Sequence, residues 1–275
     1  MNTQRILAIA QKDLLEVRQN RYAWLPMIIV PILFVLILPL AMILIPPRLQ
    51  LSPQELASQS DLEFFLQNMP PSMAQALAGL DEFQSMVLIM LGYLFAPFFL
   101  IFPLMFSTVI AAESFAGERE RKTMEALLYT PASDSELFLG KVLAALAPAI
   151  GISWGSFILY ALVLNTAGYP LFGYIWFPLP SWWPLILWIT PALALLGTAA
   201  TVLISARVHT FMGAYQTSAS LVVLVVALLI GQFSGVVYLS VGIGLLIGLV
   251  LWLVAAGLTT LAVRSFHRHT LLTSD

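Results

Sequence analysis

The chain has 275 residues, of which 60% are hydrophobic and only 9% are charged, and its mean hydropathy is +0.93. Soluble domains carry about 25% charged residues, so this chain has too little polar surface for a water-soluble globule, and the bilayer is the expected solvent for most of it. The net charge of -2 offers no basic excess for nucleic acid. The lack of cysteine excludes disulfides, thiolate catalysis and thiolate metal sites.

The first segment predicts an amphipathic helix. Ile6, Ala10, Leu14 and Val17 recur at helical spacing, and charged residues occupy the other faces. We expect this helix to lie along the cytoplasmic leaflet before the chain enters the membrane near Pro26. The alternative is a helix packed on a partner protein. No short apolar core precedes a small-residue cleavage site, so no removable signal peptide is expected.

Gaps between charged residues predict six membrane-spanning helices. A charge at mid-bilayer costs roughly 2.5–3.5 kcal/mol on insertion scales, so long uncharged stretches mark the spans. Tyr22 to Pro47 and Phe83 to Ala112 each fit one helix, whereas Val142 to Ala206 and Val208 to Val263 each fit two helices and a turn. The chain is therefore expected to be one all-α integral membrane domain over 1–275, with spans at approximately 23–46, 86–111, 140–164, 184–205, 214–232 and 237–262.

Turn signals divide the two longer stretches. In the second of them the break is Gly231 to Gly235, which predicts a tight hairpin of the last two helices. In the first, helix breakers alternate with interfacial aromatic residues, and these breakers are Asn165, Gly168, Pro170, Gly173, Pro178, Pro180 and Pro184.

The loop expected at 47–84 is acidic and is predicted to lie outside the cell. Ser52 to Glu55 form a capping box with proline at the first helical position, and Leu62, Phe65, Leu66 and Met69 follow at helical spacing. A short helix resting on the outer membrane surface is expected. The acidity has two readings, a cation-binding vestibule or a solvated loop, and the lack of a carboxylate pair beside a turn glycine favours the loop.

Basic residues set the predicted orientation. Alternate segments between the predicted spans lie on opposite sides of the membrane. Of the 12 lysines and arginines, eleven fall in the segments on one side, and Arg48 alone falls in a segment on the opposite side. By the positive-inside rule, both termini are expected to be cytoplasmic, in agreement with an even number of spans. The other basic residues are Arg5, Lys12, Arg18, Arg21, Arg119, Arg121, Lys122, Lys141, Arg207, Arg264 and Arg268.

The most informative segment is the cytoplasmic loop expected at 113–136. Glu118 and Lys122 stand at i,i+4 in the favourable order, and Met124, Leu127 and Leu128 form an apolar patch on the same predicted helix. That helix is expected to end before Pro131, and a second capping box, Ser133 to Glu136, opens the third span. A short helix fixed between two spans suits a lever moved by a bound protein. An idle, solvated connector is the alternative.

This loop resembles that of a known family. Glu113, the run Gly117-Glu-Arg-Glu-Arg-Lys-Thr-Met-Glu-Ala-Leu-Leu-Tyr-Thr-Pro131 and the pair Gly140-Lys141 resemble the permeases of ATP-binding-cassette (ABC) exporters of the type-2 branch, which export polysaccharides, drugs and sodium. Lys12-Asp13-Leu14, ahead of Arg21, also resembles the start of that family. The specific part covers about 30 residues, and the order of six spans extends the likeness over nearly the whole chain.

The resemblance implies a coupling helix that docks on a separate ATP-hydrolysing subunit, and a complex of two permeases, identical or paralogous, with two ATPases. This chain is expected to bind neither ATP nor magnesium, because its one Gly-Lys pair has Ser135 and Val142 where a phosphate-binding loop requires glycine and a hydroxyl. The docking residues that the resemblance implies are Glu113, Glu118, Arg121, Thr123, Met124, Glu125, Leu127 and Leu128.

The predicted spans contain no acidic residue, which disfavours an ion-coupled transporter, an intramembrane enzyme and a metal site. The expected function is that of a non-catalytic permease subunit of an ATP-driven exporter in the inner membrane, with a hydrophobic or amphiphilic substrate such as a lipid or drug. The alternative is a membrane-embedded scaffold that recruits a cytoplasmic partner without transport. Gly244 and Gly248 match a small-xxx-small motif that packs the last span on a neighbour, in the same chain or across a dimer.

Overall fold

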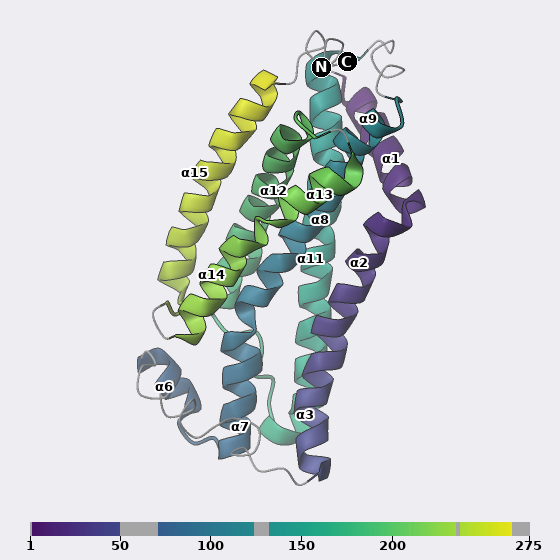
Figure 1. The fold of residues 1–275 in the computed structure, drawn as a ribbon. Helices are drawn as coiled ribbons and strands as arrows, with labels where there is room; N and C mark the ends of the chain where they lie inside the picture. Colours follow the sequence, from purple (N-terminus) through teal and green to yellow (C-terminus); the bar gives the residue numbers. More distant parts are fainter. Residues whose placement is uncertain (1, 50–70, 124–131, 209, 235–236, 266–275) are drawn as a thin grey trace.

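The structure is a computed structural model that describes residues 2–49, 71–123, 132–208, 210–234 and 237–265. These residues form helices and no strand, and six helices are long and apolar enough to cross a membrane. The predicted all-α, six-span fold class is confirmed. The helices run side by side in an elongated bundle (Figure 1). Helix α1, Thr3–Gln19, and the C-terminal end of α15, Val241–Ser265, lie at one end of the bundle, which we name the α1 end.

Each of the first two spans is one helical rod with irregular turns. The first consists of α2 (Arg21–Pro31), the π-helical segment η1 (Ile32–Ile37) and α3 (Leu38–Leu49). A short helix, α6 (Pro71–Leu77), precedes the second span. The second span consists of α7 (Glu82–Val87), η2 (Leu88–Leu94), η3 (Ala96–Leu100), α8 (Ile101–Ala112), η4 (Glu113–Gly117) and α9 (Glu118–Glu120).

The remaining spans follow in chain order. The third is the single helix α11 (Asp134–Phe172), and the fourth joins η5 (Pro184–Ile189) to α12 (Thr190–Ser205). The fifth is divided by Ser220 and Leu221 into α13 (Phe211–Ala219) and α14 (Val222–Phe233). The sixth is α15.

Two spans are longer than the sequence predicted. The second and third rods each contain 39 residues, Glu82–Glu120 and Asp134–Phe172. At 1.5 Å per residue each is about 58 Å long, whereas the hydrocarbon core of a bilayer is about 30 Å thick. Their ends therefore extend beyond the apolar layer. Asn165, Gly168 and Pro170, expected in a turn, lie within α11, which ends where Gly173 adopts a φ of 73°.

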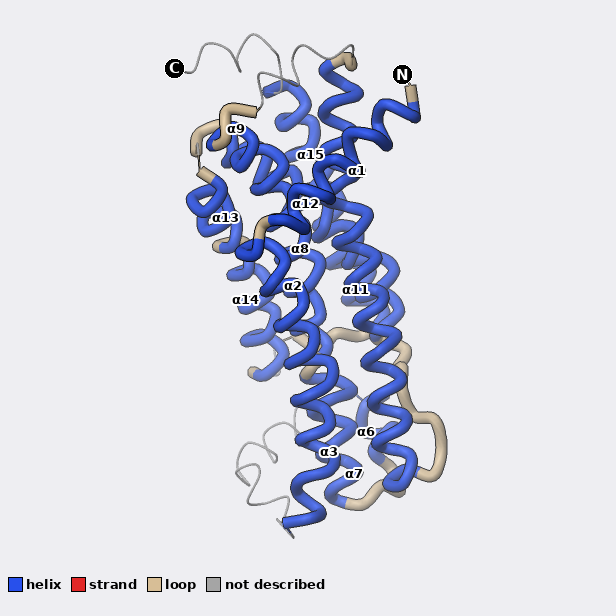
Figure 2. Tube along the Cα trace, turned by 90° about the vertical axis from the view of Figure 1, so that its right-hand side faces the viewer, coloured by secondary structure: helices blue, strands red, loops and turns tan. Residues whose placement is uncertain are grey.

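The second and fourth spans form the centre of the bundle. Most of their residues are buried, whereas few residues of the first, fifth and sixth spans are buried. Helix α8 packs against α11 and α12, and α12 packs against α15 (Figure 2). The outer helices expose large apolar side chains, such as Ile230 and Leu253. Apolar surface of this extent requires lipid or a further protein to cover it.

Irregular turns in the second span expose backbone carbonyls that other helices satisfy. Pro97 has no N–H to donate to the Tyr93 carbonyl four residues earlier. Instead, Gln232 Nε2 donates to the Tyr93 carbonyl at 2.6 Å, Trp182 Nε1 to the Gly92 carbonyl at 2.6 Å, and the Tyr160 hydroxyl to the Leu91 carbonyl at 2.8 Å. Side chains from the third span, from the loop before the fourth span and from the fifth span thus fix the position of this distorted turn.

Of the two predicted capping boxes, one lies within the described residues. The Ser133 hydroxyl accepts from the Glu136 N–H at 3.2 Å, and the Glu136 carboxylate accepts from the Ser133 N–H at 3.0 Å, so the box that opens α11 is confirmed. The capping box at Ser52 and the helix predicted after it lie outside the described residues.

The two glycines of the predicted packing motif lie against the fourth span of the same chain. A Cβ added to Gly244 would stand 3.1 Å from Pro184 Cβ, and one added to Gly248 would stand 2.1 Å from Trp188 Cδ1. Trp188 is also held by its Nε1, which donates to the Leu245 carbonyl at 3.2 Å. The last span can therefore approach the fourth closely only because Gly248 has no side chain.

Substituting Gly248→Ala is expected to destabilise the protein by about 1–3 kcal/mol, because the added methyl group displaces the Trp188 ring. Thermal unfolding of the detergent-solubilised chain measures the effect. Gly257→Ala on the same helix is the matched control, since its added Cβ meets nothing within 4 Å, and alanine there gains up to about 1 kcal/mol of helix propensity. Equal shifts in the two variants would contradict the close packing.

Candidate functional site

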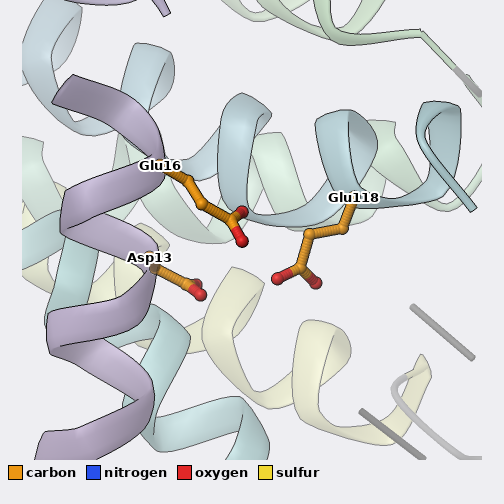
Figure 3. A group of neighbouring side chains, drawn as sticks. All are labelled: Asp13, Glu16 and Glu118. Carbon is orange, nitrogen blue, oxygen red and sulfur yellow. The ribbon is translucent and has the colours of Figure 1, made fainter. Parts of the chain in front are cut away.

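Three segments converge at the α1 end: helix α1, the last turns of the second span, and the first turns of α11. Asp13 and Glu16 of α1 and Glu118 of α9 point toward the same space (Figure 3). Asp13 and Glu118 are fully buried. Buried carboxylates require positive partners and hydrogen bonds, and lysines from two of the three segments supply them.

Lys141 of α11 is the buried centre of this cluster, with 1% of its surface exposed. Its Nζ lies 2.5 Å from Glu118 Oε2 and 3.2 Å from Asp13 Oδ2, and it donates to the Ser114 carbonyl at 2.7 Å. These three acceptors match the three N–H donors of an ammonium group. Lys141 therefore ties α1 and the second span to the third span.

Lys12 completes the cluster from the more exposed side. It forms an ion pair with Glu118 and lies 2.8 Å from Glu16. Burial lowers the pKa of Lys12, but the hydrogen bonds to Glu118 and Glu16 outweigh this effect, so the net pKa is raised above the usual lysine value. Lys12 consequently keeps its charge throughout the physiological pH range.

A second ion pair extends the cluster toward solvent. Arg121, directly after α9, lies 2.5 Å from Glu113 and 3.0 Å from Glu16, and Asn20 Nδ2 donates to Glu113 at 2.7 Å. Burial opposes the charge of Arg121, yet the hydrogen bond to Glu113 raises its pKa overall. We name this set of seven charged residues the ion network; it comprises Lys12, Asp13, Glu16, Glu113, Glu118, Arg121 and Lys141.

The carboxylates of Asp13, Glu16 and Glu118 approach within 4.8 Å of one another, a spacing compatible with a cation. In this structure Lys12 and Lys141 supply the positive charge between them. The arrangement is that of an ion-pair network whose residues connect helices.

Helix α9 also binds the turn between the fourth and fifth spans. Arg119 donates to the Ser205 carbonyl at 2.8 Å, and the Glu120 carboxylate accepts from the Phe211 N–H, the first of α13, at 2.8 Å. The last turn of the second span is thus bonded to α1, to α11 and to the turn that joins α12 to α13.

Comparison with known proteins places this arrangement in a family. The family model described as "ABC-2 family transporter protein" matches residues 7–266. The chain belongs to the ABC-2 family. It is a multi-pass membrane protein.

One relative of this ABC-2 chain is the ABC transporter permease protein NatB of Bacillus subtilis (strain 168), which is 44% identical over 57 residues. The match covers 21% of this chain and 14% of NatB, so the chain spans a small part of the length of that relative. No solved structure matches the chain.

The structure separates the docking residues that the ABC-2 resemblance implied. Glu113 and Glu118 are buried in the ion network, whereas Arg121 and Thr123 are exposed beyond α9. The Thr123 hydroxyl donates to the Glu118 carbonyl at 3.2 Å. The other four, Met124, Glu125, Leu127 and Leu128, lie outside the described residues.

The apolar spacing of α1 did not predict the burial of Asp13. We expected Leu14 on the apolar face of this helix, but Leu14 is 36% exposed, and the buried residues are Ala10, Asp13 and Val17. These three have the spacing of one helix face. An apolar pattern alone selects Leu14, and only the partner lysine on α11 explains why a carboxylate takes the inner position.

Proposed function

We propose that this chain is the membrane subunit of an ATP-driven exporter and that a separate ABC ATPase docks at the α1 end. ATP and magnesium would be bound by that ATPase and not by this chain. Segment 121–131 would form the contact, with Arg121, Thr123, Met124, Glu125, Leu127 and Leu128 toward the ATPase. Glu113 and Glu118 would act inside the bundle, where they pass the motion of this segment to the spans.

The bonding of Glu118 carries this proposal. Its two carboxylate oxygens contact Lys12 of α1 and Lys141 of α11, while its neighbours Arg119 and Glu120 bond the turn after α12. A force on α9 therefore acts on several helices at once. Buried ion pairs and close packing do not deform continuously. Helix α9 and the helices bonded to it are therefore expected to move together as a rigid body.

Charge distribution supports a cytoplasmic location for the α1 end. Arg5, Arg119, Lys122 and Arg264 belong to segments at this end, while Arg48 ends the first span at the other. The protein would lie in the inner membrane of the cell. By the positive-inside rule, the α1 end and both termini would face the cytoplasm.

Labelling of single cysteines tests this orientation, because the native chain has no cysteine. In intact cells, a membrane-impermeant maleimide should label Ala78→Cys, in the exposed turn after α6, but not Lys122→Cys. Permeabilisation should expose Lys122→Cys to the reagent. Labelling of Lys122→Cys in intact cells would overturn both the orientation and the docking proposal.

The substrate of the exporter would be hydrophobic or amphiphilic, because no acidic or basic residue lies within the central parts of the spans to bind a charged one. The complex would contain two permeases, either two copies of this chain or this chain and a paralogue. The exposed apolar surfaces of the outer helices are available for that contact. Copurification of differently tagged copies tests the first arrangement.

A charge-reversal experiment tests the coupling. The complex that copurifies with the chain is reconstituted in liposomes, and the variant Arg121→Glu with Glu125→Lys is compared with the parent. We expect the double variant to lose ATPase binding or the stimulation of ATP hydrolysis by the permease. Arg264→Glu controls for the change of charge, since Arg264 is an exposed basic residue at the same end. The melting temperature of the double variant separates a loss of docking from a loss of the Arg121 ion pairs with Glu113 and Glu16.

The copurified partner decides between transport and a scaffold. An ATPase with a phosphate-binding loop supports the exporter, and a partner that lacks this loop supports a scaffold. Full ATP hydrolysis and full export by the double variant would contradict the docking assignment.

A further inference from the structure

A cavity of about 420 Å³ lies toward the end of the bundle opposite the α1 end. It is lined by α6, the irregular part of the second span, the loop before the fourth span, and the hairpin between the last two spans. Helix α6 is fixed over it by Met73, which is 2% exposed and packs with Ile89 and Leu94. Ligand sites for small molecules occupy about 300–1,000 Å³, so this cavity is large enough for one.

Among the polar residues that line the cavity, which include Gln75, Tyr238 and Ser240, Gln232 is deeply buried. It is 3% exposed, and its Nε2 donates to the Tyr93 carbonyl at 2.6 Å. This bond fixes the amide and leaves Oε1 without a hydrogen-bond partner among the described residues. The hydroxyl of Ser181, which also lines the cavity, has none there either. A buried amide oxygen held in this way is an acceptor that lacks its donor.

The rest of the wall restricts the chemistry of a ligand. Leu179, Leu239 and Val241 present apolar surface, and none of the lining residues is acidic or basic. A charged ligand would lose its hydration here without gaining a counterion. A neutral molecule with an apolar body and one hydrogen-bond donor satisfies both the apolar wall and the free oxygen of Gln232.

We propose that this cavity is a binding site for a neutral amphiphile, whose hydroxyl or amide N–H donates to Gln232 Oε1 and whose apolar part packs on Leu179, Leu239 and Val241. The site lies within one chain and away from the ion network. Its occupancy requires neither an ATPase nor transport, so it can be tested apart from the proposed function.

Photolabelling of the full chain in lipid nanodiscs tests the proposal with defined probes. The first probe is decan-1-ol that carries a diazirine in its chain; its methyl ether, which lacks the donor, and its trimethylammonium analogue are the matched controls. The alcohol should label peptides that contain Met73–Ala76 or Tyr238–Val241 and should be displaced by unlabelled decan-1-ol. The ether should label roughly five-fold less, and the cationic analogue should not label these peptides.

Two variants make the test specific. Gln232→Met keeps the volume but removes the acceptor, together with the donor to the Tyr93 carbonyl. It should reduce labelling by the alcohol roughly five-fold more than labelling by the ether. Ala76→Trp acts from the partly exposed α6, leaves the core of the bundle untouched, and should reduce labelling by both neutral probes. The second variant keeps the test decisive if Gln232→Met does not fold.

Three results would overturn the proposal. Equal labelling by alcohol and ether would exclude recognition through Gln232. Labelling that unlabelled decan-1-ol does not displace would show partition into lipid or a cavity filled by water. Labelling unchanged in Ala76→Trp would place the probes elsewhere.

Discussion

Replacing Lys141 with methionine is expected to destabilise the protein by about 3–5 kcal/mol, the largest effect of any single substitution in the ion network. The ammonium group is buried against Asp13 and Glu118, which are themselves fully buried. Removal of one partner of a buried ion pair leaves an uncompensated charge in a low-dielectric environment. Thermal unfolding in detergent and the yield of monodisperse protein measure the loss.

Two further variants give this experiment its controls. Arg18→Met removes a positive charge from the exposed side of α1 and should change stability by less than about 0.5 kcal/mol. Lys141→Met with Asp13→Asn removes a buried charge of each sign and should recover part of the loss. A Lys141→Met protein as stable as Arg18→Met would mean that the network does not hold α1 and the second span to α11.

Substituting Gly140→Leu is expected to detach α1 from α11. A Cβ added to Gly140 would stand 2.8 Å from Ile9 Cβ and 3.0 Å from the Ile6 carbonyl oxygen. Since the contact involves backbone on α1, the helix as a whole must shift. Overpacking of this kind costs about 1–3 kcal/mol, enough to increase the population of detached α1 roughly five-fold or more.

Reaction of a single cysteine measures this detachment. Ala10 is 6% exposed in α1, so Ala10→Cys should react slowly with a maleimide in the parent and at least several-fold faster with Gly140→Leu. Gly151→Leu on the same helix is the matched control, because its added Cβ meets nothing within 4 Å. Equal rates in the two leucine variants would show that α1 does not depend on this contact.

The number of spans could be predicted from the sequence because it depends on which residues the apolar bilayer core can accept. Charged residues are excluded from a bilayer core, so the uncharged stretches count the crossings. The boundaries could not be predicted in this way, because hydropathy marks the edge of the lipid and not the end of the helix. Glu113 to Glu120 is polar, yet it continues the second span as helix.

The ion network could be predicted only in part. Glu113, Glu118 and Arg121 stood out by their place in the loop, but Asp13 and Lys141 are 128 positions apart in the chain. Their contact depends on how α1 packs on α11, which the spacing of residues within either segment does not determine. The same holds for Gln232, whose partner Tyr93 is 139 positions away.

Crosslinking shows whether the segment directly beyond α9 contacts the ATPase. Thr123→Cys, exposed directly beyond α9, is combined with a short bismaleimide and the purified complex, and Ala78→Cys at the other end of the bundle serves as the control. We expect a crosslink from Thr123→Cys to the ATPase, with a yield that changes on addition of ATP, and none from Ala78→Cys. A crosslink from Ala78→Cys, or none from Thr123→Cys in an intact complex, would mean that the ATPase does not dock at the α1 end.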